Sequence, residues 1–246
     1  MTTETAGIRQ AEVAAGLSHC LTAPPLAGPP QGPHAPGLCA PASALDRHGR
    51  LVCRLSSTMC RLLGLDRDQT SRIVLAARTH DIGKRQVPAE ILGSPGPLDG
   101  AALAVLRGHT TLGATMLQRR GLDLAATVAL RHHELWDGSG YPDGLKGADI
   151  PLAVRLVTIC DVYAALREDR PYKPGLSHEV ALDTMLRGDG SGRTRPEIFD
   201  PALFEVLLRH HTLFARVSDE PGGDQPPGQS ENPAPSGLGI APCKSK

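Results

Sequence analysis

Two segments carry most of the information in this chain: His80-Asp81-Ile82-Gly83-Lys84 and His132-His133-Glu134-Leu135-Trp136-Asp137-Gly138-Ser139-Gly140-Tyr141-Pro142. Neither a packed core nor a solvated surface requires such segments. Adjacent His-Asp and His-His pairs are typical of metal ligands, and a carboxylate can bridge two ions where an imidazole cannot. The second segment adds a stiff turn that contains a tyrosine. Together the two segments indicate a metal centre within a helical framework.

The apolar residues around these segments recur with helical spacing. Leu45, Val52, Leu55, Met59 and Leu62 mark one face, which also carries His48, and a second helix through Ile73, Val74, Ala77 and His80 is expected to be capped by Thr70 or Asp68. Further helices are expected at 99–106, 109–120, 122–133, 152–167 and 177–188, and the last one starts at Asp200-Pro201. Few segments alternate as strands do. The pattern predicts an all-α domain without a visible internal repeat.

Proline and glycine set the expected limits of this domain. Residues 22–42 are rich in both, and the segment from Asp219 onward has the same character. Such segments bury too little apolar surface to offset their chain entropy. We expect a disordered or linker segment over 1–44, one domain over 45–217 and a disordered tail over 218–246.

Composition excludes several classes of function. The formal net charge of the 246 residues is zero, so no general surface for a nucleic acid polymer is expected. No apolar run approaches the length of a membrane span, and the N-terminus lacks the pattern of a secretory signal. Six cysteines occur without a CxxC pair, and Cys53 and Cys60 have the spacing of core residues. A cytoplasmic protein without a disulfide framework or a membrane partner is expected.

Seven side chains are candidate metal ligands, and they come from at least five of the expected helices. Each lies on or beside an apolar face, so all could point into one bundle interior. Mixed imidazole and carboxylate donors suit iron, manganese, nickel or zinc. A lone His on an apolar face is more often a core residue than a ligand, so the set is stronger evidence than any member. The candidates are His48, His80, Asp81, His109, His132, His133 and Asp161.

The remaining five of the ten histidines serve as a control. His19 and His34 lie in the tails, and His178 lies in the first turn of a helix. The pair His210-His211 has no nearby aspartate or turn motif, and we interpret it as a surface pair near the end of the last helix.

These motifs resemble those of the HD-GYP family of metal-dependent phosphodiesterases, which hydrolyse cyclic di-GMP. The resemblance extends from His48 to Asp200-Pro201 and includes the stretches 155–163 and 169–173 as well as Phe199-Asp200-Pro201. It implies an HD-domain helical bundle with a C-terminal helical extension. It also implies cleavage by a hydroxide that bridges two metals, with linear pGpG, GMP or both as products.

The resemblance assigns a role to each site residue. Asp81 would bridge two metals, one completed by His48, His80 and Asp161 and the other by His109, His132 and His133. Lys84 would lie near the scissile phosphate, although a cation at a helix C-terminus is an equal interpretation. Arg170 and Lys173 would hold the phosphates of the ligand, and the loop Gly140-Tyr141-Pro142 gives the family its name. Tyr141 or Trp136 would stack on a guanine, or would simply pack.

Three departures from the family pattern matter. Some members carry Glu four residues before the first ligand His and bind a third metal; here that residue is Ala44, so at most two ions, iron or manganese, are expected. The family usually has Asp where this chain has Ala164, which is expected to loosen the surroundings of the ligands. The stretch 188–196 is longer and more polar than usual, which matters little for the chemistry.

Two alternatives stay open. The chain could hydrolyse another nucleotide such as cyclic GMP-AMP, or it could be a non-catalytic domain that binds protein partners. Possible protein partners include regulators and diguanylate cyclases of the GGDEF type. The presence of every expected ligand weighs against a non-catalytic domain, and Ala164 is the main residue in its favour.

Overall fold

The computed structural model describes residues 42–94, 96–169 and 174–220, and every regular element within these ranges is a helix. The predicted all-α class is therefore confirmed. Most of the two segments predicted to be disordered lie outside the described residues. The first described helix begins at Ala42 and the last one ends at Asp219, against predicted domain limits of 45 and 217.

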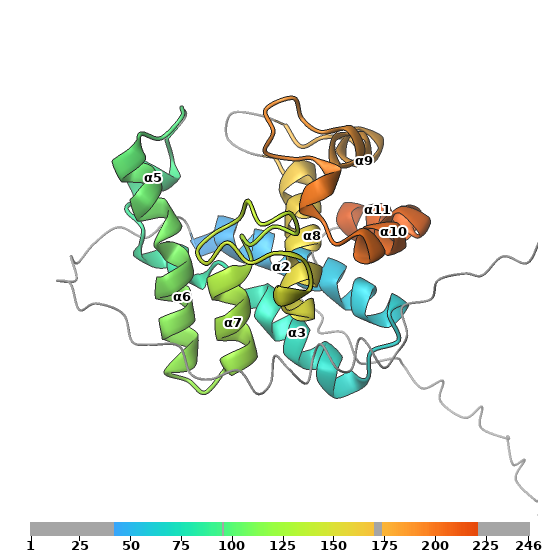
Figure 1. Ribbon diagram of the computed structural model, residues 1–246, viewed down its shortest axis with the longest axis horizontal. Coiled ribbons are helices and arrows are strands. Elements are labelled where there is room, and N and C mark those ends of the chain that lie inside the picture. The colour runs from blue at the N-terminus through green and yellow to red at the C-terminus, as the bar shows by residue number, and fades with distance from the viewer. Residues whose placement is uncertain (1–41, 95, 170–173, 221–246) are drawn as a thin grey trace, which may run out of the picture.

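Five helices pack together as the central bundle. Figure 1 shows α6 and α7 side by side at one end, with α8 between them and the C-terminal helices. Because α8 has buried residues on all its sides, it is the central helix of the domain. The five are α2 (Ala42–Leu62), α3 (Arg67–Thr79), α6 (His109–Gln118), α7 (Asp123–Arg131) and α8 (Leu152–Arg167).

The other elements are shorter and surround this bundle. Helix α9 packs on α8, α10 contacts both α8 and α2, and α11 packs on α2, so the predicted C-terminal helical extension is present. The elements are η1 (Ile82–Gln86), α4 (Ala89–Leu92), α5 (Gly100–Arg107), η2 (Gly147–Asp149), α9 (His178–Arg187), η3 (Pro196–Ile198), α10 (Pro201–Arg209) and α11 (His211–Asp219).

The start of α3 corrects the predicted cap. Asp66 caps this helix, not Thr70 or Asp68. The Asp66 carboxylate accepts the backbone N–H of Gln69 at 2.8 Å, and the Gln69 side chain accepts the N–H of Asp66 at 3.1 Å. This reciprocal pair satisfies two N–H groups that the first turn leaves free, whereas Asp68 and Thr70 lie within or after that turn. Asp99, Ser177 and Asp200 are the positions at which the sequence predicts helices to start, and they cap α5, α9 and α10.

The end of the chain also differs from the prediction. The helix that starts after Asp200 stops at Arg209, and α11 follows it as a separate helix. His210, with φ −114° and ψ 22°, makes the break. The change of direction lets Phe214 become fully buried, with its ring edge-on to Tyr163 at 6.3 Å. Burial of this large ring outweighs continuation of a single helix.

The interpretation of His210-His211 as a plain surface pair is wrong for His211. Its ring is parallel to that of His178, with centroids 5.2 Å apart, and the Nδ1 of His211 lies 2.9 Å from the Nε2 of His178. The Nδ1 of His178 in turn lies 2.8 Å from the hydroxyl of Tyr163. The two rings thereby join α9 and α11 to α8.

Three of the six cysteines lie within the described residues. Cys53, Cys60 and Cys160 are free, and Cys60 belongs to the core as predicted, whereas Cys53 is half-buried. Among the described helices, none combines the length and apolar character needed to cross a bilayer.

Candidate metal centre

The first motif lies at the junction of two helices. His80 ends α3 and Asp81 precedes η1. Gly83 lets η1 approach α6, because a Cβ at this position would lie 1.9 Å from the carbonyl oxygen of His109. His80 is fully buried and Asp81 is 7% exposed. The close approach therefore brings the carboxylate of Asp81 into the bundle, next to the start of α6.

The two carboxylate oxygens of Asp81 face different groups of histidines. Its Oδ1 lies 3.4 Å from the Nε2 of His109 and 3.5 Å from that of His132. Its Oδ2 lies 3.4 Å from the Nε2 of His80 and 2.5 Å from the Nζ of Lys84. One carboxylate thus lies between two sets of imidazoles, as a bridging ligand must.

One set is the carboxylate-rich half of the centre, formed by His48, His80 and Asp161. The Nε2 of His48 donates to the Oδ1 of Asp161 at 2.8 Å, and the Nε2 of His80 lies 3.6 Å from the same oxygen. Ligand atoms of His48, His80 and Asp81 lie within 4.8 Å of one another. Helices α2 and α8 supply His48 and Asp161 and are in contact along the bundle.

The other set is the histidine-rich half, formed by His109, His132 and His133, whose ligand atoms also lie within 4.8 Å of one another. Helix α7 ends at Arg131, so His132 and His133 leave the regular helix and their rings lie 4.1 Å apart at 42°. The two consecutive histidines therefore lie beside each other. Thr158 on α8 donates to the carbonyl oxygen of His132 at 2.9 Å and holds this helix end in place.

Backbone carbonyls fix the orientation of three of the imidazoles. The Nδ1 of His80 bonds the carbonyl oxygen of Ala77 at 2.7 Å, that of His109 bonds Leu106 at 2.6 Å, and that of His132 bonds Ala129 at 3.0 Å. All three carbonyls belong to the last turn of a helix, where they have no partner within the helix. The Nε2 of each ring therefore points toward Asp81.

Electrostatics differ between the two halves. Burial alone lowers the pKa of His48 and His80, but neighbouring carboxylates raise it to about 9 for His48 and about 10 for His80. Burial lowers the pKa of His132, and it lowers that of His133 further with help from the charge of His132. Burial acts to raise the pKa of Asp81, but the charges of Lys84 and His80 hold it well below its usual range.

The centre contains buried polar atoms that the protein leaves without a partner. The Nε2 of His80 and the Oδ1 of Asp81 are buried and accept or donate no hydrogen bond among the described residues. An unpaired buried polar atom is costly, and a metal ion coordinated by both atoms would remove that cost. The donor set of imidazoles and carboxylates fits divalent transition metals. The residues present therefore fit the metal ions that the sequence implies.

The loop after His133 covers one edge of the centre. Gly140 passes against the backbone of His133, since a Cβ there would lie 2.4 Å from its carbonyl oxygen. The ring of Tyr141 stacks on His133 at 4.8 Å, and the guanidinium of Arg107 lies 4.7 Å from the centre of the Tyr141 ring. Tyr141 therefore stacks on His133 and makes a cation–π contact with Arg107. A guanine base of the ligand would have to compete with Arg107 to stack on the Tyr141 ring.

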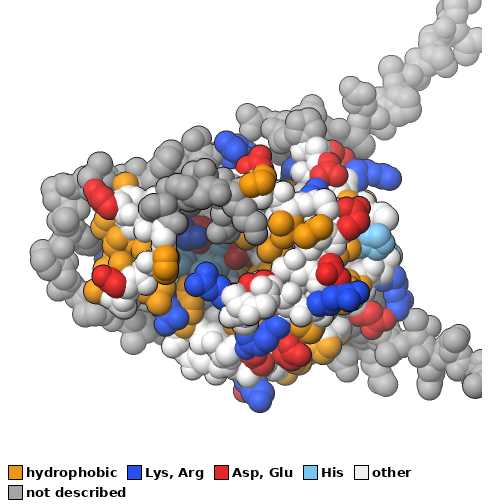
Figure 2. All heavy atoms as spheres, turned by 90° about the horizontal axis from the view of Figure 1, so that it is seen from above, with side chains coloured by type: hydrophobic (Ala, Val, Ile, Leu, Met, Phe, Trp, Pro, Cys, Tyr) orange, Lys and Arg blue, Asp and Glu red, His pale blue; other side chains and the backbone are white. Residues whose placement is uncertain are grey.

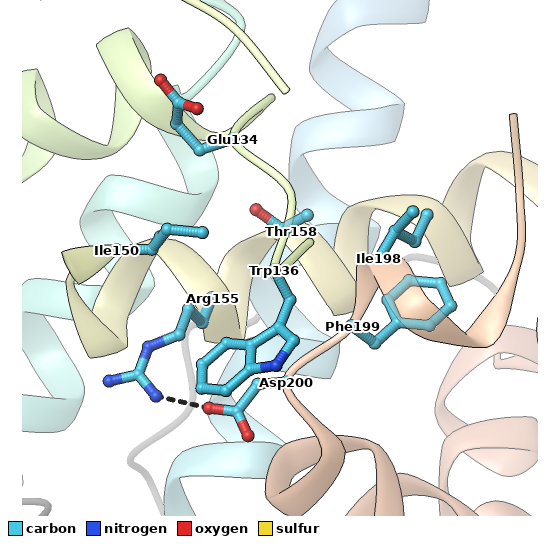
Figure 3. A pocket seen from close by; sticks show the side chains of 8 residues that line it. All are labelled: Glu134, Trp136, Ile150, Arg155, Thr158, Ile198, Phe199 and Asp200. Carbon is cyan, nitrogen blue, oxygen red and sulfur yellow. Dashed lines mark hydrogen bonds and ion pairs between the residues drawn. The ribbon is translucent and has the colours of Figure 1, made fainter. Parts of the chain in front are cut away.

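Glu134 stabilises this loop by accepting hydrogen bonds from its backbone. Its carboxylate is 1% exposed and accepts the backbone N–H groups of Asp143, Gly144 and Leu145 at 2.6, 3.2 and 3.0 Å. Figure 3 shows Glu134 and the indole of Trp136 among the side chains that line a small cavity of about 10 Å³ behind the loop. The guanidinium of Arg155 lies 5.4 Å from the centre of the Trp136 ring and forms an ion pair with the carboxylate of Asp200. Trp136 therefore packs here, which is one of the two roles the sequence allowed.

The structure brings together all seven predicted ligands, with Lys84 and Tyr141 at the edge of the group. Arg170 and Lys173 lie outside the described residues. Ala164 is fully buried in the apolar core and brings no polar atom to the centre. Sequence reasoning missed Arg107 and Glu168, whose carboxylate lies 2.6 Å from the Nδ1 of His48. Sequence reasoning could have singled out Glu134, because this acidic residue directly follows the His132-His133 pair.

Comparison with known proteins agrees with this geometry. A family model described as "HD domain" matches residues 37–198 of the chain. The chain belongs to the HD-GYP branch of the HD domain family. A solved structure of an HD-GYP-type protein, Bd1817 from Bdellovibrio bacteriovorus, is 23% identical, covers 67% of this chain and 52% of its own, and has a TM-score of 0.52, which supports the same fold.

Curated relatives are more similar in sequence. The cyclic di-GMP phosphodiesterase response regulator RpfG of Xanthomonas campestris is 40% identical over 169 residues, covering 68% of this chain and 43% of the relative. A cyclic di-GMP phosphodiesterase of Thermotoga maritima is 41% identical over 181 residues, covering 71% and 48%. The 3'3'-cGAMP-specific phosphodiesterase 1 of Vibrio cholerae is 36% identical over 173 residues, covering 70% and 39%. The HD-GYP chain thus spans less than half the length of these relatives.

Proposed function

We propose that this chain is a metal-dependent phosphodiesterase that hydrolyses cyclic di-GMP to linear pGpG, GMP or both. The observation that carries the proposal is the position of Asp81, with one oxygen toward His80 and the other toward His109 and His132. A carboxylate placed in this way can hold two ions close together. Two similar proteins named as cyclic di-GMP phosphodiesterases support the choice of substrate.

The chain's own residues would bind the ions and prepare the site for a phosphate. When bound, two divalent ions clamp a phosphodiester, lower the pKa of a water and neutralise phosphoryl oxygens. One ion would be held by His48, His80 and Asp161, and the other ion would be held by His109, His132 and His133. Asp81 would bind both ions. Iron or manganese suits these mixed donors.

Lys84 and the loop residues would meet the substrate. The Nζ of Lys84 lies 2.5 Å from the Oδ2 of Asp81, and its charge would offset negative charge that develops on the phosphoryl oxygens. Figure 2 shows histidine side chains in a hollow of the surface, with Lys and Arg side chains around it. Arg107 over Tyr141 adds a guanidinium near the histidine-rich half. We also assign phosphate binding to Arg170 and Lys173, as the family resemblance implies.

Metal counting together with turnover tests this function. The protein is purified anaerobically, its metals are counted, and cyclic di-GMP turnover is followed by chromatography with iron or manganese supplied. We expect close to two ions per chain and formation of pGpG or GMP. His210→Ala is a matched control, because His210 is a partly buried histidine away from the centre, and it should change neither result. Absence of metal even after addition would support the non-catalytic interpretation.

A second substrate has its own support. Two similar Vibrio cholerae proteins, 35% and 36% identical, are named as 3'3'-cGAMP-specific phosphodiesterases. The two cyclic dinucleotides should therefore be compared side by side at equal concentration. A higher kcat/KM for cyclic di-GMP supports the first proposal, and a higher value for 3'3'-cGAMP would replace it.

A further inference from the structure

We infer that Glu168 is a positioning residue for the metal centre, which holds His48 in the orientation that presents its Nε2 to an ion. The Nδ1 of His48 donates to the Oε2 of Glu168 at 2.6 Å, while its Nε2 faces Asp161 at 2.8 Å. The inference rests on the proposed metal binding, but it does not depend on which substrate is cleaved.

The position of His48 in the chain explains why its ring is oriented by a side-chain acceptor and not by a backbone carbonyl. His80, His109 and His132 use carbonyl oxygens in the last turn of a helix. His48 instead lies inside α2, where the nearby carbonyls already accept helical hydrogen bonds. No free carbonyl is within reach along its own helix. Its orienting acceptor must come from another element, and Glu168 at the end of α8 supplies it.

The backbone of Glu168 is held firmly enough for this role. Its N–H donates to the carbonyl oxygen of Ala164 at 3.0 Å and closes the last turn of α8. Next to it, Arg167 donates to the carbonyl oxygen of Leu176 at 2.5 Å, and Leu176 donates to that of Leu166 at 2.8 Å. Asp161 and Glu168 are seven residues apart and so lie on one face of the helix region. One helix therefore places a carboxylate on each side of the His48 ring.

The Glu168 side chain lies between His48 and a second cavity. This cavity of about 310 Å³ is lined by Arg47, Arg50, Arg54 and Arg167 as well as by Glu168. The Oε1 of Glu168 is buried and has no hydrogen-bond partner among the described residues, so Oε2 and its bond to His48 account for the carboxylate's contacts. Without Glu168 the imidazole would open to the cavity and could rotate or change tautomer. Loss of such an orienting partner typically costs about 10–100-fold in metal affinity.

Metal binding to matched variants tests the role without relying on turnover. Mn²⁺ affinity and stoichiometry are measured by chelator competition for the wild type, Glu168→Ala, Glu168→Gln and Glu220→Ala, after circular dichroism has shown that each is folded. Glu168→Ala should weaken one of two ions about 10–100-fold and leave the other unchanged. Glu168→Gln keeps an oxygen acceptor for Nδ1–H and should restore most of that affinity. Glu220→Ala removes an acidic residue of the same cavity that does not touch His48, and it should bind as the wild type does.

Two outcomes would overturn the inference. One is a Glu168→Ala protein that binds both ions with wild-type affinity. The other is equal weakening of both ions in Glu168→Ala and Glu168→Gln, which would indicate a general structural role. A wild type that binds two ions but cleaves neither cyclic dinucleotide would sink the proposed function and leave the positioning role intact.

Discussion

The two halves of the centre offer different numbers of carboxylates to the same kind of imidazole. In the carboxylate-rich half, neighbouring carboxylates raise the pKa of both histidines: Asp161 and Glu168 act on His48, and Asp81 and Asp161 act on His80. In the histidine-rich half, His132 is buried and His133 is partly buried among other imidazoles, which keeps the pKa of both low. In the metal-free protein, His48 and His80 therefore carry protons at neutral pH, whereas His132 and His133 do not. The two ions should respond differently to pH.

Removing the residue that both halves share should have the largest effect. Asp81→Ala takes away the only described carboxylate that faces both groups of histidines, and it removes the carboxylate that pairs with Lys84. We expect loss of both ions and turnover below detection, because each ion loses a ligand. Metal analysis and chromatography of the products measure this. An Asp81→Ala protein that retains two ions would show that the halves are independent and that no bridge is needed.

Changing the pH should separate the halves. With pKa values of about 9 and 10, His48 and His80 carry protons at neutral pH in the metal-free protein, and an ion must displace them. Affinity of the carboxylate-rich half should therefore rise about tenfold per pH unit for each proton displaced, up to those pKa values. His132 and His133 should add little pH dependence to metal affinity above pH 7, since their pKa lies below the ordinary value. Calorimetry of Mn²⁺ binding in buffers of different ionisation enthalpy counts the released protons.

The same groups affect the stability of the metal-free protein, and the sign follows from linkage. A raised pKa means that the folded state binds more protons than the unfolded state between pH 6.5 and about 9 to 10. The stabilising contribution of His48 and His80 is present below pH 6.5 and is lost as the pH rises through this window. Denaturation with a chelator present should show this loss, whereas metal-loaded protein should not. Flat stability in both states would contradict the raised pKa values.

Substitution of a residue that is expected to touch the substrate should change metal binding in neither half of the centre. Arg170→Ala should leave two ions bound and weaken cyclic di-GMP binding by about 10- to 150-fold, since a charge-assisted hydrogen bond to phosphate contributes about 1.5–3 kcal/mol. Metal counting and equilibrium binding of the nucleotide measure the two effects separately. Wild-type behaviour in both assays would mean that the ligand pose implied by the family is wrong for this chain.

The sequence indicated which side chains would face the centre better than it indicated the residues that support them. His48, His80 and Asp161 fall on apolar helical faces, so periodicity alone directs them inward. Glu168 is 120 residues from His48, and its contact depends on how α2 and α8 cross, which no local pattern encodes. The separate α11 was missed for a similar reason, because the break at His210 serves the burial of Phe214 against a distant helix. Local spacing indicates which face a residue takes, but not which partner it meets there.

Trimming the termini should have the smallest effect, and it would sharpen the comparison at the carboxylate-rich half. A protein limited to 45–217 lacks the first three residues of α2 and also Asp219, which pairs with Arg167 next to Glu168. Asp219 is mostly exposed, so its loss should cost less than about 1 kcal/mol. We expect this protein to fold and to keep its phosphodiesterase activity, and a protein limited to 42–220 to match the full chain in thermal stability. If the shorter protein stays helical but loses the ion of the carboxylate-rich half alone, the first turn of α2 orders His48, and the predicted domain limit at Leu45 is wrong.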